Sequence, residues 1–134
     1  MKAKMISFEI YDPLYVANVV CVFNCNQDEF AEFLRLQYKC IINYGENDIA
    51  IARQDSVVLN TTKGKTTMFY VWIEKYGDDS TLVHECAHLT FSIFDDRGVE
   101  ISRANDEAFC YYLDYIVARI KCGAKEIEMK GKKK

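Results

Sequence analysis

The chain of 134 residues has only two histidines and one proline, and it has no long apolar run. Its longest apolar stretches fall well short of the ~20 residues that a membrane-spanning helix needs, so no membrane segment is expected. The N-terminal sequence MKAKMISFEIYDP has neither the apolar core nor the small-residue cleavage site of a secretory signal. We therefore expect a cytoplasmic protein that folds in a reducing compartment.

Charge is close to balanced, and neither sign forms an extended cluster. The chain has 17 Lys and Arg against 20 Asp and Glu, which gives a formal net charge of -3. A nucleic-acid-binding face needs clustered Lys and Arg opposite the phosphates, and the only basic cluster is KGKKK at residues 130–134. We expect no nucleic-acid partner, and we interpret residues 123–134 as a disordered or frayed tail.

Six cysteines are present, but their spacing predicts neither a disulfide framework nor a closed zinc site. Cys21 and Cys25 form a C-x3-C pair, and no second close pair or third histidine completes a four-ligand site. Without a secretory signal, we expect the thiols to stay reduced and to pack as small apolar groups. Cys86 is expected to face the core, although it lies between the histidines in sequence.

Hydrophobic patterning predicts one α+β domain over residues 1–134. Strands are expected at residues 4–11 and 14–23, paired as a hairpin, and at residues 56–62 and 66–76, around the turn sequence KGK. Another turn is expected at residues 43–48. Helices are expected at residues 27–38 with an Asn26–Glu29 capping box, at residues 81–94 with Ser80 as N-cap and Gly98 as the left-handed end, and after Ser102.

The sequence VHECAH contains both histidines of the chain, four residues apart. Residues four apart on a helix lie on one face about one turn from each other, so His84 and His88 direct two imidazoles toward one point. Two neutral imidazoles on a rigid helix are suitable zinc ligands. Glu85 lies roughly 100° around the helix from His84, where its carboxylate reaches a metal-bound water rather than the metal.

The residues around the motif predict a buried helix. Apolar side chains occupy most of the other positions, which are Leu82, Val83, Cys86, Ala87, Leu89 and Phe91. Two histidines and a glutamate buried without partners would cost several kcal/mol. A metal ion that binds the histidines removes that cost, so the pattern favours a metal site over a purely structural helix.

Eighteen residues lie between His88 and Glu107, and the chain turns back near Gly98. If the two helices pack antiparallel, Glu107 comes beside the histidines. H-E-x-x-H followed by a glutamate at this spacing resembles the gluzincin branch of zinc metallopeptidases. The resemblance implies a minimal zincin-like fold with a small sheet and one zinc ion per chain. It also implies the ligands His84, His88 and Glu107, with Glu85 as general base.

Residues 55–120 also resemble short zincin-like proteins encoded by phages and prophages, which carry E-A-x-x-Y on the second helix. In this chain that sequence is EAFCY, and it ends at Tyr111. Tyr111 is a candidate catalytic residue that hydrogen-bonds a ligand or an oxyanion; the alternative is a buried tyrosine with a satisfied hydroxyl. Gluzincins of the thermolysin type have an acid where Tyr111 stands, and here the next acid on that face is Asp114.

Two classes of function fit these residues. In the first, the chain hydrolyses peptide bonds: Glu85 takes a proton from zinc-activated water, and the strand at residues 66–75 pairs with an extended substrate. In the second, it is a zincin-like binding or inhibitory module that acts on a host protein without catalysis. Glu85 favours the enzyme, because a purely structural site has no need of a carboxylate beside its ligands. A di-iron bundle is excluded, because it needs a second E-x-x-H and no third histidine exists.

Overall fold

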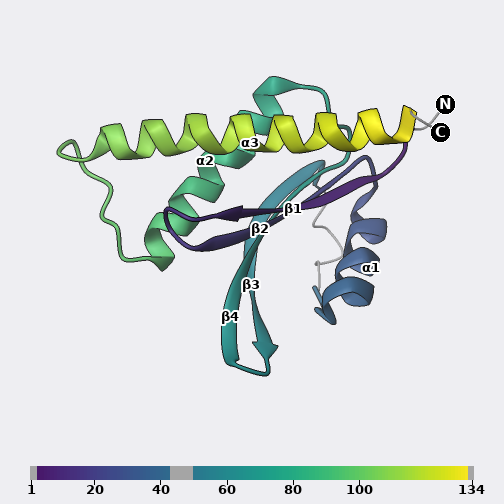
Figure 1. Cartoon of the computed structure of the whole chain (residues 1–134), viewed down its shortest axis with the longest axis horizontal. Coiled ribbons are helices and arrows are strands. Elements are labelled where there is room, and N and C mark those ends of the chain that lie inside the picture. The colour runs from purple at the N-terminus through teal and green to yellow at the C-terminus, as the bar shows by residue number, and fades with distance from the viewer. Residues whose placement is uncertain (1–2, 43–49, 133–134) are drawn as a thin grey trace.

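Four strands form one mixed sheet with the order β1-β2-β4-β3. The computed structural model describes residues 3–42 and 50–132 and confirms the predicted α+β class (Figure 1). The strands are β1 (Ile6–Asp12), β2 (Ala17–Phe23), β3 (Ala52–Thr61) and β4 (Gly64–Ile73). The helices are α1 (Gln27–Tyr38), α2 (Asp79–Asp96) and α3 (Asp106–Lys132).

Both predicted hairpins are confirmed, and a parallel pairing joins them. β1 pairs with β2, and β3 pairs with β4, in antiparallel fashion. β2 and β4 run parallel, from Asn18 opposite Met68 to Phe23 opposite Ile73. β4 is therefore an inner strand with both edges paired, and β3 is an edge strand. The turn predicted at residues 43–48 lies outside the described residues.

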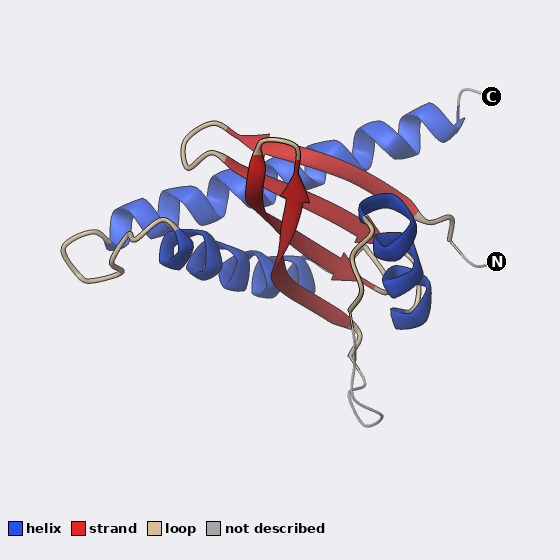
Figure 2. Ribbon diagram, turned by 90° about the horizontal axis from the view of Figure 1, so that it is seen from below, coloured by secondary structure: helices blue, strands red, loops and turns tan. Residues whose placement is uncertain are grey.

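The sheet separates two apolar clusters, with α2 and α3 on one face and α1 on the other (Figure 2). Successive side chains of β4 alternate between the two clusters. Phe69, Val71 and Ile73 belong to the cluster under α2 and α3, whereas Met68, Tyr70 and Trp72 belong to the cluster under α1. Because both faces are covered, β4 is buried from Met68 to Ile73.

Helix α1 begins with the predicted capping box. The Asn26 side chain accepts from the Glu29 N–H at 2.8 Å, and the Glu29 carboxylate accepts from the Asn26 N–H at 2.9 Å. Phe30 and Leu34 are the fully buried residues of this helix, and the Phe30 ring stacks on Trp72 with centroids 5.5 Å apart. The helix thus closes the face of the sheet opposite α2.

Helix α2 is longer than predicted at both ends. Its N-cap is Asp78 rather than Ser80, because the Asp78 carboxylate accepts from the Ser80 N–H at 2.9 Å. At the other end Gly98 has a φ of 70°, and the Val99 N–H donates to the Phe94 carbonyl at 2.8 Å. These features form the left-handed helix end that the sequence predicts at Gly98.

Helix α3 differs from the prediction at both ends. It begins at Asp106, because Ser102 lies in a preceding turn in which its N–H donates to Asn105 Oδ1 at 2.8 Å. It continues to Lys132, so residues 123–132 are helical rather than frayed. Lys and Glu, which dominate this segment, are good helix formers, and that propensity extends the helix. No helix in the described part of the chain is both long and apolar enough to cross a membrane.

A buried carboxylate joins α3 to the β1–β2 turn. Asp12 is 0% exposed and accepts from the Tyr112 hydroxyl at 2.8 Å. It also accepts from the backbone N–H groups of Leu14 at 2.9 Å and Tyr15 at 3.3 Å. Asp12 is the last residue of β1. The structure shows that Asp12 also fixes the position of α3.

Candidate metal centre

His84 and His88 converge on the outer face of α2. Their Nε2 atoms are 3.2 Å apart, and their ring centroids are 4.8 Å apart. Two nitrogens that each lie about 2.0–2.1 Å from a tetrahedral zinc ion are themselves about 3.3 Å apart. The observed separation therefore fits two ligands of one metal ion. It also fits a direct N–H···N hydrogen bond, in which one ring donates and the other accepts.

The helix is not buried on all sides, which corrects the prediction from its composition. His84 and His88 are both exposed, and so are their neighbours Val83 (41%) and Phe91 (51%). Water can satisfy exposed imidazoles, so the cost of burying them does not argue for a metal here. Of the three polar residues of the motif, His84, Glu85 and His88, only Glu85 is buried, with 7% of its surface exposed.

Glu85 is one of the residues that line a hollow between α2 and the start of β3. The hollow has a volume of about 330 Å³ and is lined by Ile51, Ala52, Ser80, Thr81, His84 and Glu85. Burial raises the pKa of Glu85 above its usual value, and the nearby His84, His88 and Arg53 oppose that rise. A partly desolvated carboxylate therefore lies directly beside the two imidazoles, which is the placement expected of a general base.

Cys86 faces away from the histidines, as predicted. Its side chain is fully buried in the cluster that α2 shares with the sheet. Burial, together with the charge of Glu85, raises the pKa of Cys86 to about 12. Because metal ligation requires the thiolate, this thiol is unsuited to completing the site.

Glu107 is not brought beside the histidines, in contrast to the expectation from the resemblance. The two helices do run antiparallel, since Lys121 Nζ lies 3.1 Å from an Asp79 carboxylate oxygen and the Phe109 ring lies 4.8 Å from that of Phe91. Glu107 precedes Phe109 and so lies level with the C-terminal end of α2. Phe94, in the last turn of α2, follows His88 by six residues, or roughly 9 Å at about 1.5 Å of rise per residue.

Aromatic packing is the physical reason for this register. Phe109 packs against both Phe91 and Phe94, which fixes the first turns of α3 over the last turns of α2. Among the residues that the structure describes, no group of three His, Cys, Asp or Glu side chains is arranged to hold a metal ion. Glu107 as third ligand therefore stays a prediction.

Tyr111 points to solvent rather than to the histidines. It is 71% exposed, and Asp114 on the same helical face is exposed as well. Its neighbour Tyr112 is the buried tyrosine with a satisfied hydroxyl, because it donates to Asp12. Tyr111 is thus neither placed near the histidines, as a catalytic role would need, nor buried, as the alternative interpretation expected.

Strand β3, not β4, borders the histidines. Ser92 follows His88 by one helical turn, and its hydroxyl donates to Gln54 Oε1 of β3 at 2.9 Å. The sequence favoured residues 66–75 as the strand that pairs with substrate, but β4 already has partners on both edges. Gln54 and Arg53 were not predicted as site residues. The signal that could have found this edge is the four-residue repeat of polar side chains at His84, His88 and Ser92, from which no prediction was drawn.

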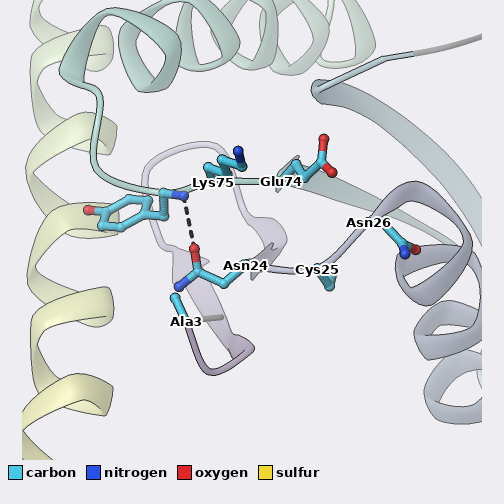
Figure 3. Close-up of a pocket in the computed structure, with 7 residues that line it drawn as sticks. Ala3, Asn24, Cys25, Asn26, Glu74 and Lys75 are labelled. Atoms are coloured by element: carbon cyan, nitrogen blue, oxygen red, sulfur yellow. Dashed lines mark hydrogen bonds between the residues drawn. The ribbon is translucent and has the colours of Figure 1, made fainter. Parts of the chain in front are cut away.

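A second hollow lies at the carboxyl ends of the parallel strands β2 and β4 (Figure 3). It has a volume of about 400 Å³ and is lined by Ala3, Asn24, Cys25, Asn26, Glu74, Lys75 and Tyr76. The Asn24 amide uses both its ends within the fold, because its oxygen accepts from the Tyr76 N–H at 3.0 Å and its nitrogen donates to the Lys4 carbonyl at 3.2 Å. Because the Asn24 amide already makes hydrogen bonds within the fold, it is less available to a ligand. This hollow is therefore a weaker candidate than the histidine site.

Comparison with known proteins supplies no relative for this chain. No protein-family model matches it, and no curated protein or solved structure matches it either. The resemblance to gluzincins therefore rests on the H-E-x-x-H motif and its spacing to Glu107. Any function has to be argued from the geometry around His84 and His88.

Proposed function

We propose that the chain is a zinc-dependent hydrolase of peptide bonds, with His84 and His88 as metal ligands and Glu85 as general base. The observation that carries the proposal is the 3.2 Å separation of the two Nε2 atoms, with the buried Glu85 carboxylate beside them. A structural histidine pair would not require a buried acid at the same place. The edge strand β3 and the adjoining hollow leave room for an extended peptide next to these residues.

The roles of the residues follow from their positions. Bound zinc would polarise the scissile carbonyl and lower the pKa of a bound water to about 7. Glu85 accepts a proton from the attacking water and returns it to the leaving amine. His84 and His88 would hold the metal on helix α2, which also carries the Glu85 carboxylate.

A catalytic zinc site takes three protein ligands and keeps one position open. Glu107 is the third ligand that the resemblance implies, and its position before Phe109 puts it level with the last turn of α2. Metal binding through Glu107 is therefore coupled to a change in the first turn of α3. Zinc should alter amide hydrogen exchange at residues 100–110, while the exchange of β2 and β4 should stay the same.

The position of Glu107 also favours a second candidate function. With two exposed histidines and no third ligand beside them among the described residues, the same face suits a binding module that seats a partner without catalysis. Such a module would use the exposed residues of α2 and β3 for contact and would not depend on Glu85 as a base. The two candidates therefore differ in what Glu85→Gln should do.

The test combines metal content with the effect of Glu85→Gln. Purified protein never exposed to chelator should contain about one zinc per chain, and His88→Ala should lose it. Glu85→Gln should retain the zinc and lower cleavage of a mixed peptide library by about 10²–10⁴-fold, because Gln cannot accept the proton. Glu126→Gln, an exposed change on α3, is the matched control and should leave cleavage unchanged.

Each outcome decides between the candidates. Absence of a transition metal, together with weak binding of added zinc, removes the metal site altogether. Bound zinc without cleavage of any peptide leaves the binding module as the better interpretation. Cleavage that persists at full rate in Glu85→Gln shows that Glu85 is not the base.

A further inference from the structure

The exposed side of α2 continues beyond the histidines as a stripe that is polar except for Phe91. His84, His88, Ser92 and Asp95 fall within roughly 80° of one another around the helix, at about 100° per residue. The hollow at Glu85 lies at the N-terminal end of this stripe, and β3 borders it through the bond between Ser92 and Gln54. A peptide seated across the histidines would therefore extend along the stripe toward Asp95.

A larger hollow lies at the C-terminal end of the stripe; we call it the distal hollow. Its volume is about 570 Å³, and its lining residues are Phe91, Ser92, Asp95, Val99, Glu100 and Ile101. Two of its large apolar side chains stay in contact with solvent, with Phe91 51% and Ile101 38% exposed. The hollow is held in place, because the Phe91 ring packs on Phe109 and Ser92 bonds to Gln54.

The charge of the distal hollow is uncompensated. Asp95 and Glu100 are both exposed carboxylates, and neither makes an ion pair within the described part of the chain. The adjacent Asp96, in contrast, is paired with Arg97. A hollow whose lining combines the exposed apolar side chains of Phe91 and Ile101 with two unpaired carboxylates suits an apolar side chain that has a cationic neighbour.

We propose that the distal hollow is a specificity site that takes an apolar side chain of an extended peptide and pairs an adjacent Lys or Arg with Asp95 and Glu100. The inference rests on the proposed function, since it names the substrate class of the same face. Asp95 follows His88 by seven residues, or about 10 Å along the helix. An extended peptide covers that distance in about three residues at ~3.3 Å each, so the preferred residues lie near the scissile bond.

The experiment measures binding apart from cleavage. The full chain carrying Glu85→Gln is titrated against three fluorescein-labelled octapeptides that differ only in a central Leu-Lys, Leu-Glu or Ser-Lys pair, and fluorescence anisotropy is read at low salt. The Leu-Lys peptide should bind at least about fivefold more tightly than either of the others, as expected for an exposed charge pair added to apolar contact. The double change Asp95→Asn with Glu100→Gln should remove the preference for Lys over Glu.

Matched variants locate the effect. Ile101→Ser should remove the preference for Leu over Ser, and the double change Asp114→Asn with Glu126→Gln should leave both preferences intact. Far-UV circular dichroism checks each fold, and if Ile101→Ser unfolds, the charge variant alone decides the question. Equal or undetectable binding of the three peptides overturns the proposal, and so does a Lys preference that survives loss of Asp95 and Glu100.

The same peptides separate this inference from the proposed function. They are also incubated with the wild-type chain and zinc, and cleavage is followed by mass spectrometry. Selective binding without cleavage contradicts the peptidase and supports the specificity site. Cleavage without the Leu-Lys preference supports the peptidase and contradicts the specificity site.

Discussion

Gly123 sets how closely α3 packs on β1. A Cβ atom at this position would lie 2.5 Å from Cε2 and 2.8 Å from Cδ2 of Phe8. Carbon atoms in favourable contact are about 3.5–4.0 Å apart, so about 1 Å of relief is needed. The Phe8 ring is itself held edge-on against Phe23, with centroids 5.8 Å apart. Gly123→Ala must therefore displace Phe8 or lift α3 from the sheet.

The magnitude follows from two opposing terms. Overpacking a core contact costs about 1–3 kcal/mol, whereas replacing Gly by Ala inside a helix contributes up to about 1 kcal/mol of stability. Gly123→Ala should therefore lower the free energy of unfolding by about 0–2 kcal/mol. Gly131 lies in the same helix, and a Cβ atom there would meet nothing within 4 Å, so Gly131→Ala receives only the favourable term.

Urea unfolding followed by circular dichroism measures both variants. Gly123→Ala should be less stable than Gly131→Ala by about 1–3 kcal/mol. Combining Gly123→Ala with Phe8→Leu should recover part of the loss, because the ring that the new methyl group meets is gone. If Gly123→Ala is as stable as Gly131→Ala, then α3 does not pack on Phe8 as described.

Two further predictions concern buried carboxylates. Asp12→Ala removes the acceptor for the Tyr112 hydroxyl and for two N–H groups, so it should cost about 2–4 kcal/mol in urea unfolding, with the exposed Asp114→Ala as control. Glu85→Gln should stabilise zinc-free protein near neutral pH. Because the pKa of Glu85 is raised in the folded state, wild-type stability falls as pH rises from the usual glutamate value through the raised one. The stabilisation by Glu85→Gln should vanish at pH values below the usual glutamate pKa. A stabilisation that does not change with pH refutes this reasoning.

Local chemistry makes most of the elements predictable from the sequence. The capping box at Asn26, the left-handed Gly98 and the alternation along β4 each depend on residues close in sequence. The predicted N-cap of α2 lies two residues late, because the sequence GDDS offers several side chains with cap chemistry and it is Asp78 that accepts from a backbone N–H. The sequence underestimates the extent of α3, because a polar segment at the end of a chain resembles a frayed tail.

Non-local packing explains the larger errors. The parallel pairing of β2 with β4 places β4 inside the sheet, and no local pattern indicates which hairpin edge another strand will cover. The sequence does not reveal the exposure of His84 and His88, because an apolar composition does not show which side of a helix meets the sheet. The position of Glu107 depends on how Phe109 meets Phe91 and Phe94, and spacing along the chain cannot supply that register.

The residues of α2 that build the core are different from the residues of the H-E-x-x-H motif. Leu82, Cys86, Leu89 and Ile93 form its buried side, and they complete the core without His84, Glu85 or His88. The histidines face water and contribute nothing to that core, while burial of Glu85 opposes folding at neutral pH. The fold does not need His84 or His88, and Glu85 destabilises it. The presence of these residues therefore calls for an explanation other than folding. The proposed metal-dependent site would supply one.

The attachment of helix α3 bears on the two proposed functions in different ways. Beyond Phe109, the helix is held by Tyr112 on Asp12, by Lys121 on Asp79 and by the contact of Gly123 with Phe8. A rigid movement that carried Glu107 to the histidines would break all three attachments. The change that leaves them intact is confined to the first turn of α3 and the loop before it. A catalytic zinc site therefore requires local rearrangement there, whereas a binding module can use the structure as it stands.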